Sequence, residues 1–306
     1  MSGLRIVSLL PSATEIVAAV GMADRLVGRS HQCDFPVQVR HLPALSETKV
    51  NLEGTSGDID RRVNEIIAQG VSVYRVDADL LRALKPDVIL TQTQCAICAV
   101  TPGDLEDALC EWTGTAPTLV SLEPNDLSDV WGDMRKVGRA LGTEGAAERA
   151  IAGLQGRLAA IRGTAGRAAY RPTVAAIEWI DPLMAGGNWM PELIEAAGGE
   201  SLFATAGQHS PWLDWSALAA ADPDVILLLP CGFTIDQSLA DLPLLRGRRE
   251  WARLSAARRG QVYVIDGHHY FNRPGPRLVE SAEMIAEILH PDLFDFGHEG
   301  AGWVRL

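Results

Sequence analysis

The sequence predicts an α/β protein of two lobes, each built on a mainly parallel sheet, joined by a helical connector. Three observations predict this class. Strand-like runs alternate with helical patterns along the 306 residues. The sequence Pro86-Asp87-Val88-Ile89-Leu90 recurs as Pro223-Asp224-Val225-Ile226-Leu227. Between the two copies lies a long helical stretch, residues 125–162, with few turn signals.

The first lobe opens with a predicted strand at residues 4–10, followed by a turn at Pro11-Ser12. A helix over residues 13–20 follows. Ser12 can cap it with Glu15 three residues later, which is the capping-box pattern. Gly21 then ends the helix.

The rest of this lobe follows the same plan. We expect a short strand at 26–29, a surface loop at 42–57, helices at 58–69 and 78–84, and strands at 87–91 and 117–121. The run Asp87-Val-Ile-Leu-Thr91 is continuously apolar after its first residue, which is typical of a strand buried on both faces.

The connector divides the chain into three parts. Its apolar positions Leu127, Val130, Met134, Val137 and Leu141 recur at spacings of three and four, so they predict one face of a helix. Gly142 is the main interruption. We therefore expect a first lobe at residues 1–124, a connecting helix at 125–168 and a second lobe at 169–306.

The second lobe repeats the order of the first. Residues 173–199 carry a strand, a longer loop and a helix that ends in glycine, as residues 4–21 do. The strand after Pro223 matches the one after Pro86, and residues 261–266 take the place of the strand at 117–121.

Composition limits the partners. The chain has 39 acidic and 27 basic residues, a formal net charge of −12, which argues against nucleic acid and against electrostatic binding to an anionic membrane. No apolar run approaches the roughly 20 residues of a membrane span. The amino-terminal residues do not fit a secretory signal. We therefore expect a cytoplasmic protein, or a periplasmic one only if a leader precedes this sequence.

Ligands of open parallel sheets bind outside the carboxyl ends of the strands. The loops that the prediction places there are rich in thiols, imidazoles and indoles. They contain Cys33, Cys95, Cys98, Cys231, His31, His209, His268, His269, Trp179, Trp189, Trp212 and Trp215. Two lobes that present these ends to each other would enclose a cleft, and tryptophan offers a large flat face suited to a planar ligand.

The cysteines allow two interpretations. Cys95 and Cys98 have the spacing that lets two thiolates reach one ion, and Cys33 and Cys231 could complete a four-thiolate site for zinc or an iron–sulfur cluster. The alternative is that all four are buried thiols that simply pack. Nucleophile, phosphate-loop, dinucleotide and zinc-helix motifs are absent, so an enzyme based on Cys231 with His268 or His269 is the weakest interpretation.

The motifs Arg5-Ile-Val-Ser-Leu-Leu-Pro-Ser-Ala-Thr-Glu-Ile16, Leu84-Lys-Pro-Asp-Val-Ile-Leu90 and Gly267-His-His-Tyr-Phe-Asn-Arg-Pro-Gly-Pro-Arg-Leu278 resemble the cobalamin- and iron-siderophore-type substrate-binding proteins of ABC importers. The resemblance is nearest to the cobalamin-binding branch. It implies two Rossmann-like lobes joined by one long rigid helix, with the ligand between the lobes. Exported members carry a leader, which makes a transporter partner doubtful here. The cysteine-bearing loops are a further departure from that family.

These observations give one leading interpretation and one rival. The leading one is a non-catalytic binding protein for a corrinoid such as cobalamin, or a related large metal chelate, because the loops hold many indoles and only Arg29 and Arg273 as nearby cations. The candidate contacts are Pro11, Ser12, His31, Glu178, Trp179, Trp189, Trp212, Phe233, His268, Tyr270 and Asn272. The rival is an intracellular metalloprotein that holds zinc or an iron–sulfur cluster on Cys33, Cys95, Cys98 and Cys231.

Overall fold

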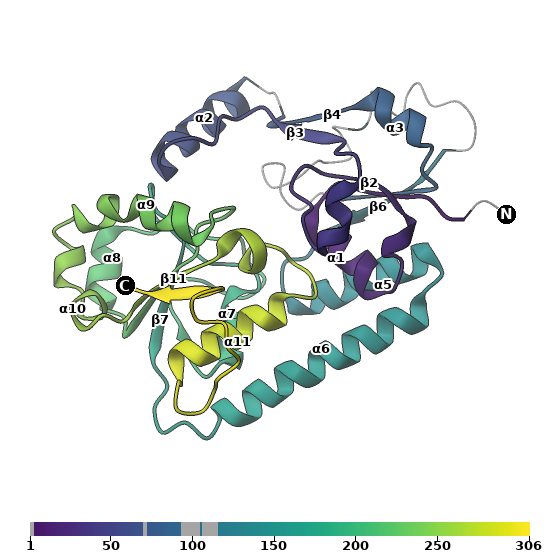
Figure 1. Ribbon diagram of the computed structural model, residues 1–306. Coiled ribbons are helices and arrows are strands. Elements are labelled where there is room, and N and C mark those ends of the chain that lie inside the picture. Colours follow the sequence, from purple (N-terminus) through teal and green to yellow (C-terminus); the bar gives the residue numbers. More distant parts are fainter. Residues whose placement is uncertain (1–2, 70–71, 93–104, 106–115) are drawn as a thin grey trace. The chain divides into compact units, whose positions relative to one another are not determined.

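A computed structural model describes residues 3–69, 72–92, 105 and 116–306. The chain forms two compact units (Figure 1). Unit 1 consists of Met1–Leu52, Arg61–Pro124 and Ser128–Gly153, and unit 2 of Glu53–Asp60, Asn125–Leu127 and Leu154–Leu306. Each unit contains one main sheet with helices around it. The predicted α/β class is confirmed.

The main sheet of unit 1 is parallel throughout. Its strands are β1 (Ile6–Ser8), β2 (Leu26–Arg29), β5 (Val88–Gln92) and β6 (Thr118–Leu122), in the order β2-β1-β5-β6. Every residue of β5 is buried, as its apolar run predicts. All four predicted strands are confirmed: β2 has the predicted bounds, and the other three differ by one or two residues at each end.

Helix α1 of unit 1 begins at a different residue from the one predicted. Helix α1 begins at Pro11, so Ser12 lies inside its first turn and Leu10 is the N-cap residue. No side chain caps this helix, and the expected capping box of Ser12 and Glu15 is wrong. The reason is that Pro11 fits the first helical position, where its missing N–H costs nothing. Unit 1 contains α1 (Pro11–Ala19), α3 (Ala78–Leu84) and the short 3₁₀ turns Ala23–Arg25 and Val37–His41. Helix α2 (Ser56–Ala68) begins in unit 2 and continues in unit 1 from Arg61.

The stretch expected to be a surface loop at 42–57 contains a strand. Here β3 (Ser46–Thr48) pairs antiparallel with β4 (Tyr74–Val76), outside the main sheet. Both strands have three residues, which is too short for a pattern of alternating burial to be recognised in the sequence. The pairing between segments 26 residues apart was therefore missed.

The connector consists of two helices, α5 (Leu127–Leu141) and α6 (Glu144–Ala165). They are separated at Gly142, whose φ of 68° lies in the left-handed region that favours glycine. Gly142 is thus the interruption that the sequence indicated. The boundary between the units falls inside α6, between Gly153 and Leu154.

The sheet of unit 2 has three parallel central strands with short strands at its edges. Strand β7 (Thr173–Trp179) pairs with β10 (Val225–Leu228), and β10 pairs with β11 (Val262–Ile265). The edge strands are β8 (Met184–Ala185), β9 (Glu200–Ser201) and β12 (Trp303–Arg305). The helices are α7 (Met190–Ala196), α8 (Trp215–Ala221), α9 (Ile235–Arg246), α10 (Ser255–Arg259) and α11 (Leu278–Leu289).

The internal repeat is confirmed at the level of single hydrogen bonds. Asp87 precedes β5 and accepts from the N–H of Arg5 at 2.8 Å, and Asp224 precedes β10 and accepts from the N–H of Thr173 at 3.0 Å. In both cases the donor is the residue just before the strand partner of the following valine, since Val88 pairs with Ile6 and Val225 with Val174. The preceding helices, α3 and α8, also end alike, with left-handed caps.

Each sheet packs into its own core. In unit 1, Val7, Leu9, Leu81 and Ile89 belong to one buried cluster, and in unit 2 a second cluster includes Ile177, Ile226 and Val264. Burial of these aliphatic side chains is the main source of stability for each unit. Among the described residues, no helix has the length and hydropathy to span a bilayer.

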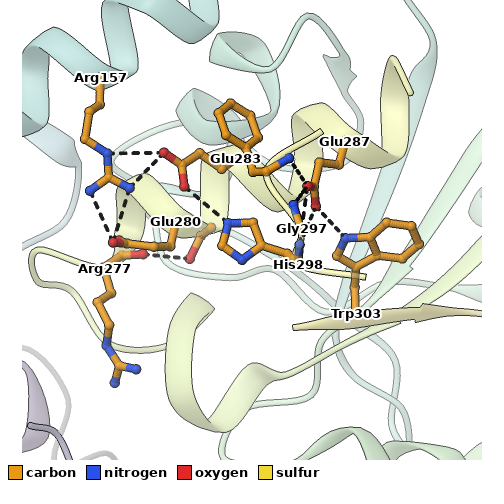
Figure 2. A network of polar contacts seen from close by, with 10 residues as sticks. Arg157, Arg277, Glu280, Glu283, Glu287, Gly297, His298 and Trp303 are labelled. Carbon is orange, nitrogen blue, oxygen red and sulfur yellow. Dashed lines mark hydrogen bonds and ion pairs between the residues drawn. The ribbon is translucent and has the colours of Figure 1, made fainter. Parts of the chain in front are cut away.

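The last segment of unit 2 is held on α11 by a polar network (Figure 2). The Glu287 carboxylate accepts from the backbone N–H groups of Phe296, Gly297 and His298 and from the indole N–H of Trp303. One turn earlier, Glu283 bonds the His298 ring at 3.2 Å. Arg157 of α6 completes the network, because its guanidinium pairs with the carboxylates of both Glu280 and Glu283.

Candidate functional site

The carboxyl end of β7 has a bulge at Glu178, next to Trp179. Along β7 and β8, Ile177 pairs with Ala185 and Trp179 with Met184, so Glu178 is an extra residue in the ladder. Such bulges commonly re-aim side chains next to binding sites. Here the bulge presents Glu178 and Trp179 at the edge where ligands of parallel sheets bind.

Glu178 is oriented by a buried serine. The Ser210 hydroxyl donates to Glu178 Oε2 at 2.9 Å and accepts from the N–H of Gly187 at 3.0 Å. A Cβ on Gly187 would lie 2.5 Å from the backbone nitrogen of Ser210, so only glycine allows the two segments to approach this closely. The carboxylate therefore has a defined position at the strand end.

Trp179 packs edge-on against Phe233, with ring centroids 5.3 Å apart. Its indole Nε1 is buried and has no hydrogen-bond partner among the described residues. An unpaired buried N–H costs about 1–3 kcal/mol. This donor is the kind of group that a ligand acceptor would satisfy.

A second indole lies two strands away. Met184 pairs with Trp179 on one side and forms an isolated bridge with Trp212 on the other. The side chain of Trp212 is 64% exposed, which is unusual for tryptophan. Trp179, Met184 and Trp212 thus form a row of two indoles and a thioether, a polarisable surface suited to a flat ligand.

The residues after β11 form a π-helical turn, Gly267–Phe271. Asp266 begins it and bonds both the backbone N–H of His269 at 2.9 Å and the ring Nδ1 of His269 at 2.7 Å. Burial alone would raise the pKa of Asp266, but the hydrogen bonds from His269 and the nearby imidazoles lower it below its usual value overall. The carboxylate is therefore ionised at neutral pH. π-helical turns of this kind are often found at functional sites.

Three of the other expected contacts are engaged within unit 2. Trp189 is buried and donates its indole N–H to the carbonyl of Phe271 at 2.9 Å. Asn272 donates its amide to the carbonyls of Leu229 and Gly267. The guanidinium of Arg277 lies over the Tyr270 ring, 4.9 Å from its centroid.

In unit 1, His31 occupies the loop after β2. Its ring Nδ1 lies 2.9 Å from the hydroxyl of Ser46, its ring lies near Tyr74, and its Nε2 is buried without a hydrogen-bond partner among the described residues. Burial lowers the pKa of His31, and the charge of Arg29 adds to this effect. The imidazole is therefore neutral at physiological pH. Pro11 and Ser12 lie in the first turn of α1, and Ser12 is buried.

The two described cysteines of the expected metal site have different surroundings. Cys33 is 1% exposed, and its sulfur lies 3.0 Å from the hydroxyl of Thr14 and 3.3 Å from that of Ser30. Cys231 is half-buried and donates its backbone N–H to the Glu178 carbonyl at 3.0 Å. Cys95 and Cys98 lie outside the described residues.

The two cations near these loops are bound by the protein itself. Arg29 donates to the carbonyls of Leu42, Ser30 and Arg40. Arg273 is buried and lies 3.2 Å from the His268 ring. Both guanidinium groups therefore donate to groups of the protein itself.

The structure brings Glu178, Trp179 and Phe233 together with Cys231 and His268 at one edge of unit 2. His268 belongs to this edge because its backbone N–H donates to the Phe233 carbonyl at 2.9 Å. The sequence did not indicate Met184, Ser210 or Asp266 as members of this edge. The spacing of Asp266 and His269, three residues apart at the start of a turn, was a signal that could have revealed one of them.

Solved structures with this fold include proteins named for binding heme and vitamin B12. The chain is similar to the periplasmic heme-binding protein RhuT from Roseiflexus sp. RS-1, with a TM-score of 0.70 and 22% identity over 95% of this chain and 99% of that one. It is also similar to the periplasmic vitamin B12-binding protein BtuF of Vibrio cholerae, with a TM-score of 0.66 and 20% identity over 93% of this chain and 96% of that one. These likenesses establish the fold.

Two curated relatives match nearly the whole chain. An uncharacterized ABC transporter substrate-binding lipoprotein, YvrC of Bacillus subtilis, is 23% identical over 95% of this chain and 81% of its own length. A vitamin B12-binding protein of Vibrio cholerae is 23% identical over 93% of this chain and 88% of its own. These names describe binding proteins rather than enzymes. They do not support the expected cytoplasmic setting or the alternative of an intracellular metalloprotein.

The family assignment rests on the longest match. Residues 6–268 match the sequence profile of the family described as periplasmic binding protein, and this range includes the sheets of both units except β12. The resemblance noted in the opening motif is therefore confirmed over most of the chain. The chain belongs to the periplasmic binding protein family.

Proposed function

We propose that this protein binds a corrinoid such as cobalamin, or a closely related large metal chelate, without chemically changing it. The observation that carries the proposal is Trp179, whose buried indole N–H has no acceptor among the described residues while its ring packs on Phe233. A corrinoid has a flat macrocycle and amide carbonyls at its periphery. It would therefore supply an apolar surface and an acceptor at the same place.

The loops after the strands hold few cations, which favours a ligand with an uncharged periphery over an anionic one. Arg29 and Arg273 are engaged with backbone carbonyls and with His268, respectively. Heme presents two carboxylates, whereas the side chains of cobalamin are amides. Relatives named for vitamin B12 and structural neighbours named for heme make these two ligands the informative pair to compare.

An ABC importer is the partner class that we propose, because the Bacillus subtilis relative is named as a substrate-binding lipoprotein of such a transporter. Four thiolates around zinc or an iron–sulfur cluster find no support in these relatives. Metal analysis of the purified protein tests that alternative directly.

The proposal is tested by titrating the protein with cyanocobalamin and, separately, with hemin, following tryptophan fluorescence and heat. We expect cyanocobalamin to bind more tightly than hemin. Trp179→Phe keeps an aromatic ring, although a smaller one, and removes the N–H, so we expect affinity to fall at least about 5- to 10-fold, the effect of one lost hydrogen bond. Trp212→Ala should weaken binding through lost contact area.

Trp215→Phe is the matched control, because the Trp215 ring lies beneath Arg248 at the start of α8, packs against the core of unit 2 and is not one of the candidate contacts. Its affinity should equal that of the unmodified protein. No binding of cyanocobalamin at about 100 μM, a concentration at which even weak specific ligands are detected, would overturn the proposal. Tighter binding of hemin would overturn the choice of a corrinoid.

A further inference from the structure

A short segment of unit 2 has a charge opposite to that of the whole chain. Residues 246–259 hold six arginines and one glutamate, a net charge of +5, whereas the chain has a formal net charge of −12. The segment consists of the end of α9, the 3₁₀ turn Trp251–Arg253 and α10 (Figure 1). All six arginines are exposed: Arg246, Arg248, Arg249, Arg253, Arg258 and Arg259.

The packing of the segment directs its arginines to the surface. Trp251, Leu254 and Ala256 belong to the buried core of unit 2. These apolar side chains occupy the inner face of the segment, so the arginines between and around them lie on its outer face. No large apolar side chain of residues 246–259 is exposed. The outer face is therefore charged and has no apolar centre.

The protein itself neutralises few of these charges. Arg258 donates to the Ser255 hydroxyl at 3.2 Å, and Arg259 lies 3.5 Å from Asp224. Like charges gathered on one segment repel, which lowers the stability of the folded state. Three of the six arginines have no hydrogen bond or ion pair within the described part of the chain: Arg246, Arg249 and Arg253.

The carboxylates that face the segment from the loop before β10 already have partners. Asp222 accepts from both the N–H and the hydroxyl of Ser255 at 2.6 Å. Asp224 accepts from the N–H and the hydroxyl of Thr173 and from the Tyr170 hydroxyl. Both carboxylates fix the backbone around the repeat, so they cannot serve the arginines as well. The outer face keeps an excess of positive charge.

The chemistry of the outer face favours phosphate over the surface of another protein. A guanidinium group donates two parallel hydrogen bonds to a phosphate and is more weakly hydrated than an ammonium group. Clusters of about four to eight such cations are typical of surfaces that bind anionic phospholipids. Stable protein–protein interfaces are built around aromatic or apolar anchors, which this segment does not present.

We propose that residues 246–259 form a peripheral contact with the anionic phospholipid surface of a membrane. Arg246, Arg249 and Arg253 bind the lipid phosphates, and no part of the chain inserts. The importer that we propose as partner lies in a membrane, so this contact keeps the protein near it. The net charge of −12 does not oppose the contact, because charges more than about 10 Å from the lipid are screened at 0.1 M salt. The local charge of the segment then decides.

Co-sedimentation with lipid vesicles tests the inference. The full chain is mixed with vesicles of phosphatidylcholine alone or with added phosphatidylglycerol, at low salt. We expect binding to the anionic vesicles only, and its loss at about 500 mM NaCl, where screening is strong. The triple variant Arg246→Gln, Arg249→Gln and Arg253→Gln should bind at least about 10-fold more weakly, since each arginine near an anionic surface strengthens binding several-fold.

The matched control removes three exposed arginines of α5 and α6 instead, namely Arg139→Gln, Arg149→Gln and Arg162→Gln. It changes the net charge by the same amount, and its binding should stay within about 2-fold of the unmodified protein because these charges lie outside the segment. Thermal unfolding checks that both triple variants are folded.

Absence of binding to the anionic vesicles, equal binding to both kinds of vesicle, or equal weakening by the two triple variants would overturn the inference. Stronger binding to polyglutamate than to the anionic vesicles at the same salt would assign the segment to an acidic protein and exclude the membrane as its partner. The measurement uses no corrinoid, so its failure leaves the proposed function standing, and failure of the corrinoid titration leaves the membrane contact standing.

Discussion

The hydroxyl of Ser210 joins Glu178 Oε2, at 2.9 Å, to the backbone N–H of Gly187, at 3.0 Å. One buried hydroxyl therefore both orients a carboxylate at the carboxyl edge of β7 and satisfies a backbone donor in the following loop. The position of Glu178 therefore depends on Ser210.

Replacing Ser210 with alanine should affect stability and binding together. Ser210→Ala leaves the Gly187 N–H without its acceptor, so we expect the free energy of unfolding to fall by about 1–2 kcal/mol. Corrinoid affinity should fall about 3- to 10-fold because Glu178 loses its fixed position. Chemical unfolding and calorimetry measure the two effects. Ser216→Ala, at an exposed position of α8, is the control, and equal behaviour of the two variants would contradict this account.

Asp133 should make unit 1 less stable as pH rises. Burial raises the pKa of this carboxyl to about 6, although the N–H of Glu123 donates to it at 3.1 Å. The folded state therefore binds the proton more tightly than the unfolded state does. The stability gained at low pH is lost as pH rises from about 4 to about 6, and above that the full penalty applies.

Asp133→Asn keeps an acceptor for Glu123 and removes the charge. We expect it to raise the free energy of unfolding at pH 7.5 by about 1–3 kcal/mol and to make little difference at pH 4. Urea unfolding at both pH values measures this. If Asp133→Asn is less stable than the unmodified protein at pH 7.5, neighbouring groups stabilise the ionised Asp133 carboxylate and the prediction is wrong.

His298 should also lose a stabilising contribution as pH rises, because its protonated form is favoured in the folded state. Its hydrogen bond to Glu283 raises its pKa, and the charges of Glu287, Glu283 and Glu280 add to this against the effect of burial. This contribution is complete below about pH 6.5, the ordinary value for histidine, and is lost as pH rises through the raised value.

We therefore expect the segment after α11 to loosen as pH rises above about 6.5, the ordinary pKa of histidine, because His298 then loses its proton. Hydrogen exchange at Gly297 and the fluorescence of Trp303 report on this segment, since both contact Glu287. His298→Gln should remove the pH dependence, whereas His41→Gln, at an exposed site in unit 1, should retain it. Identical profiles for the two variants would rule out His298 as the origin.

Asp87 and Asp224 occupy equivalent positions in the two copies of the repeat, but we expect them to contribute differently to the free energy of unfolding. Asp224 accepts from the N–H and hydroxyl of Thr173 and from the Tyr170 hydroxyl, whereas Asp87 accepts from the N–H of Arg5. Asp224→Ala should lower the free energy of unfolding by about 1–2 kcal/mol, and Asp87→Ala by less. Thermal unfolding of the two variants compares them, and a larger loss for Asp87→Ala would contradict the ranking.

Much of the fold followed from local patterns. The alternation of strands and helices, the repeat at Pro86 and Pro223, and the break at Gly142 each have a local physical cause, namely burial of an apolar run, a proline-led strand entry and a left-handed glycine. Helix α3 matched its predicted bounds because Asp77 caps it and Pro86 prevents its continuation.

Elements that depend on distant partners were missed. Strands β3 and β4 have three residues each and are stable only because they pair with each other. The sequence places Pro11 in a turn, whereas the structure begins α1 at Pro11, with two residues between this helix and Ser8, the end of β1. Short strands have no burial period of their own, so no local pattern could reveal them.

For the candidate site, the sequence by itself determined which chemical groups gather at the ends of the strands: indoles, imidazoles, thiols and few cations. That information is local, because it depends only on which residues follow each strand. Only the tertiary structure decided which groups touch. It joined Ser210 to Glu178 and Arg273 to His268, and it left the Trp179 indole without an acceptor among the described residues. Those relationships depend on the register of β8 against β7 and on the close approach of Gly267 to Pro230, which are distances between segments far apart in the chain.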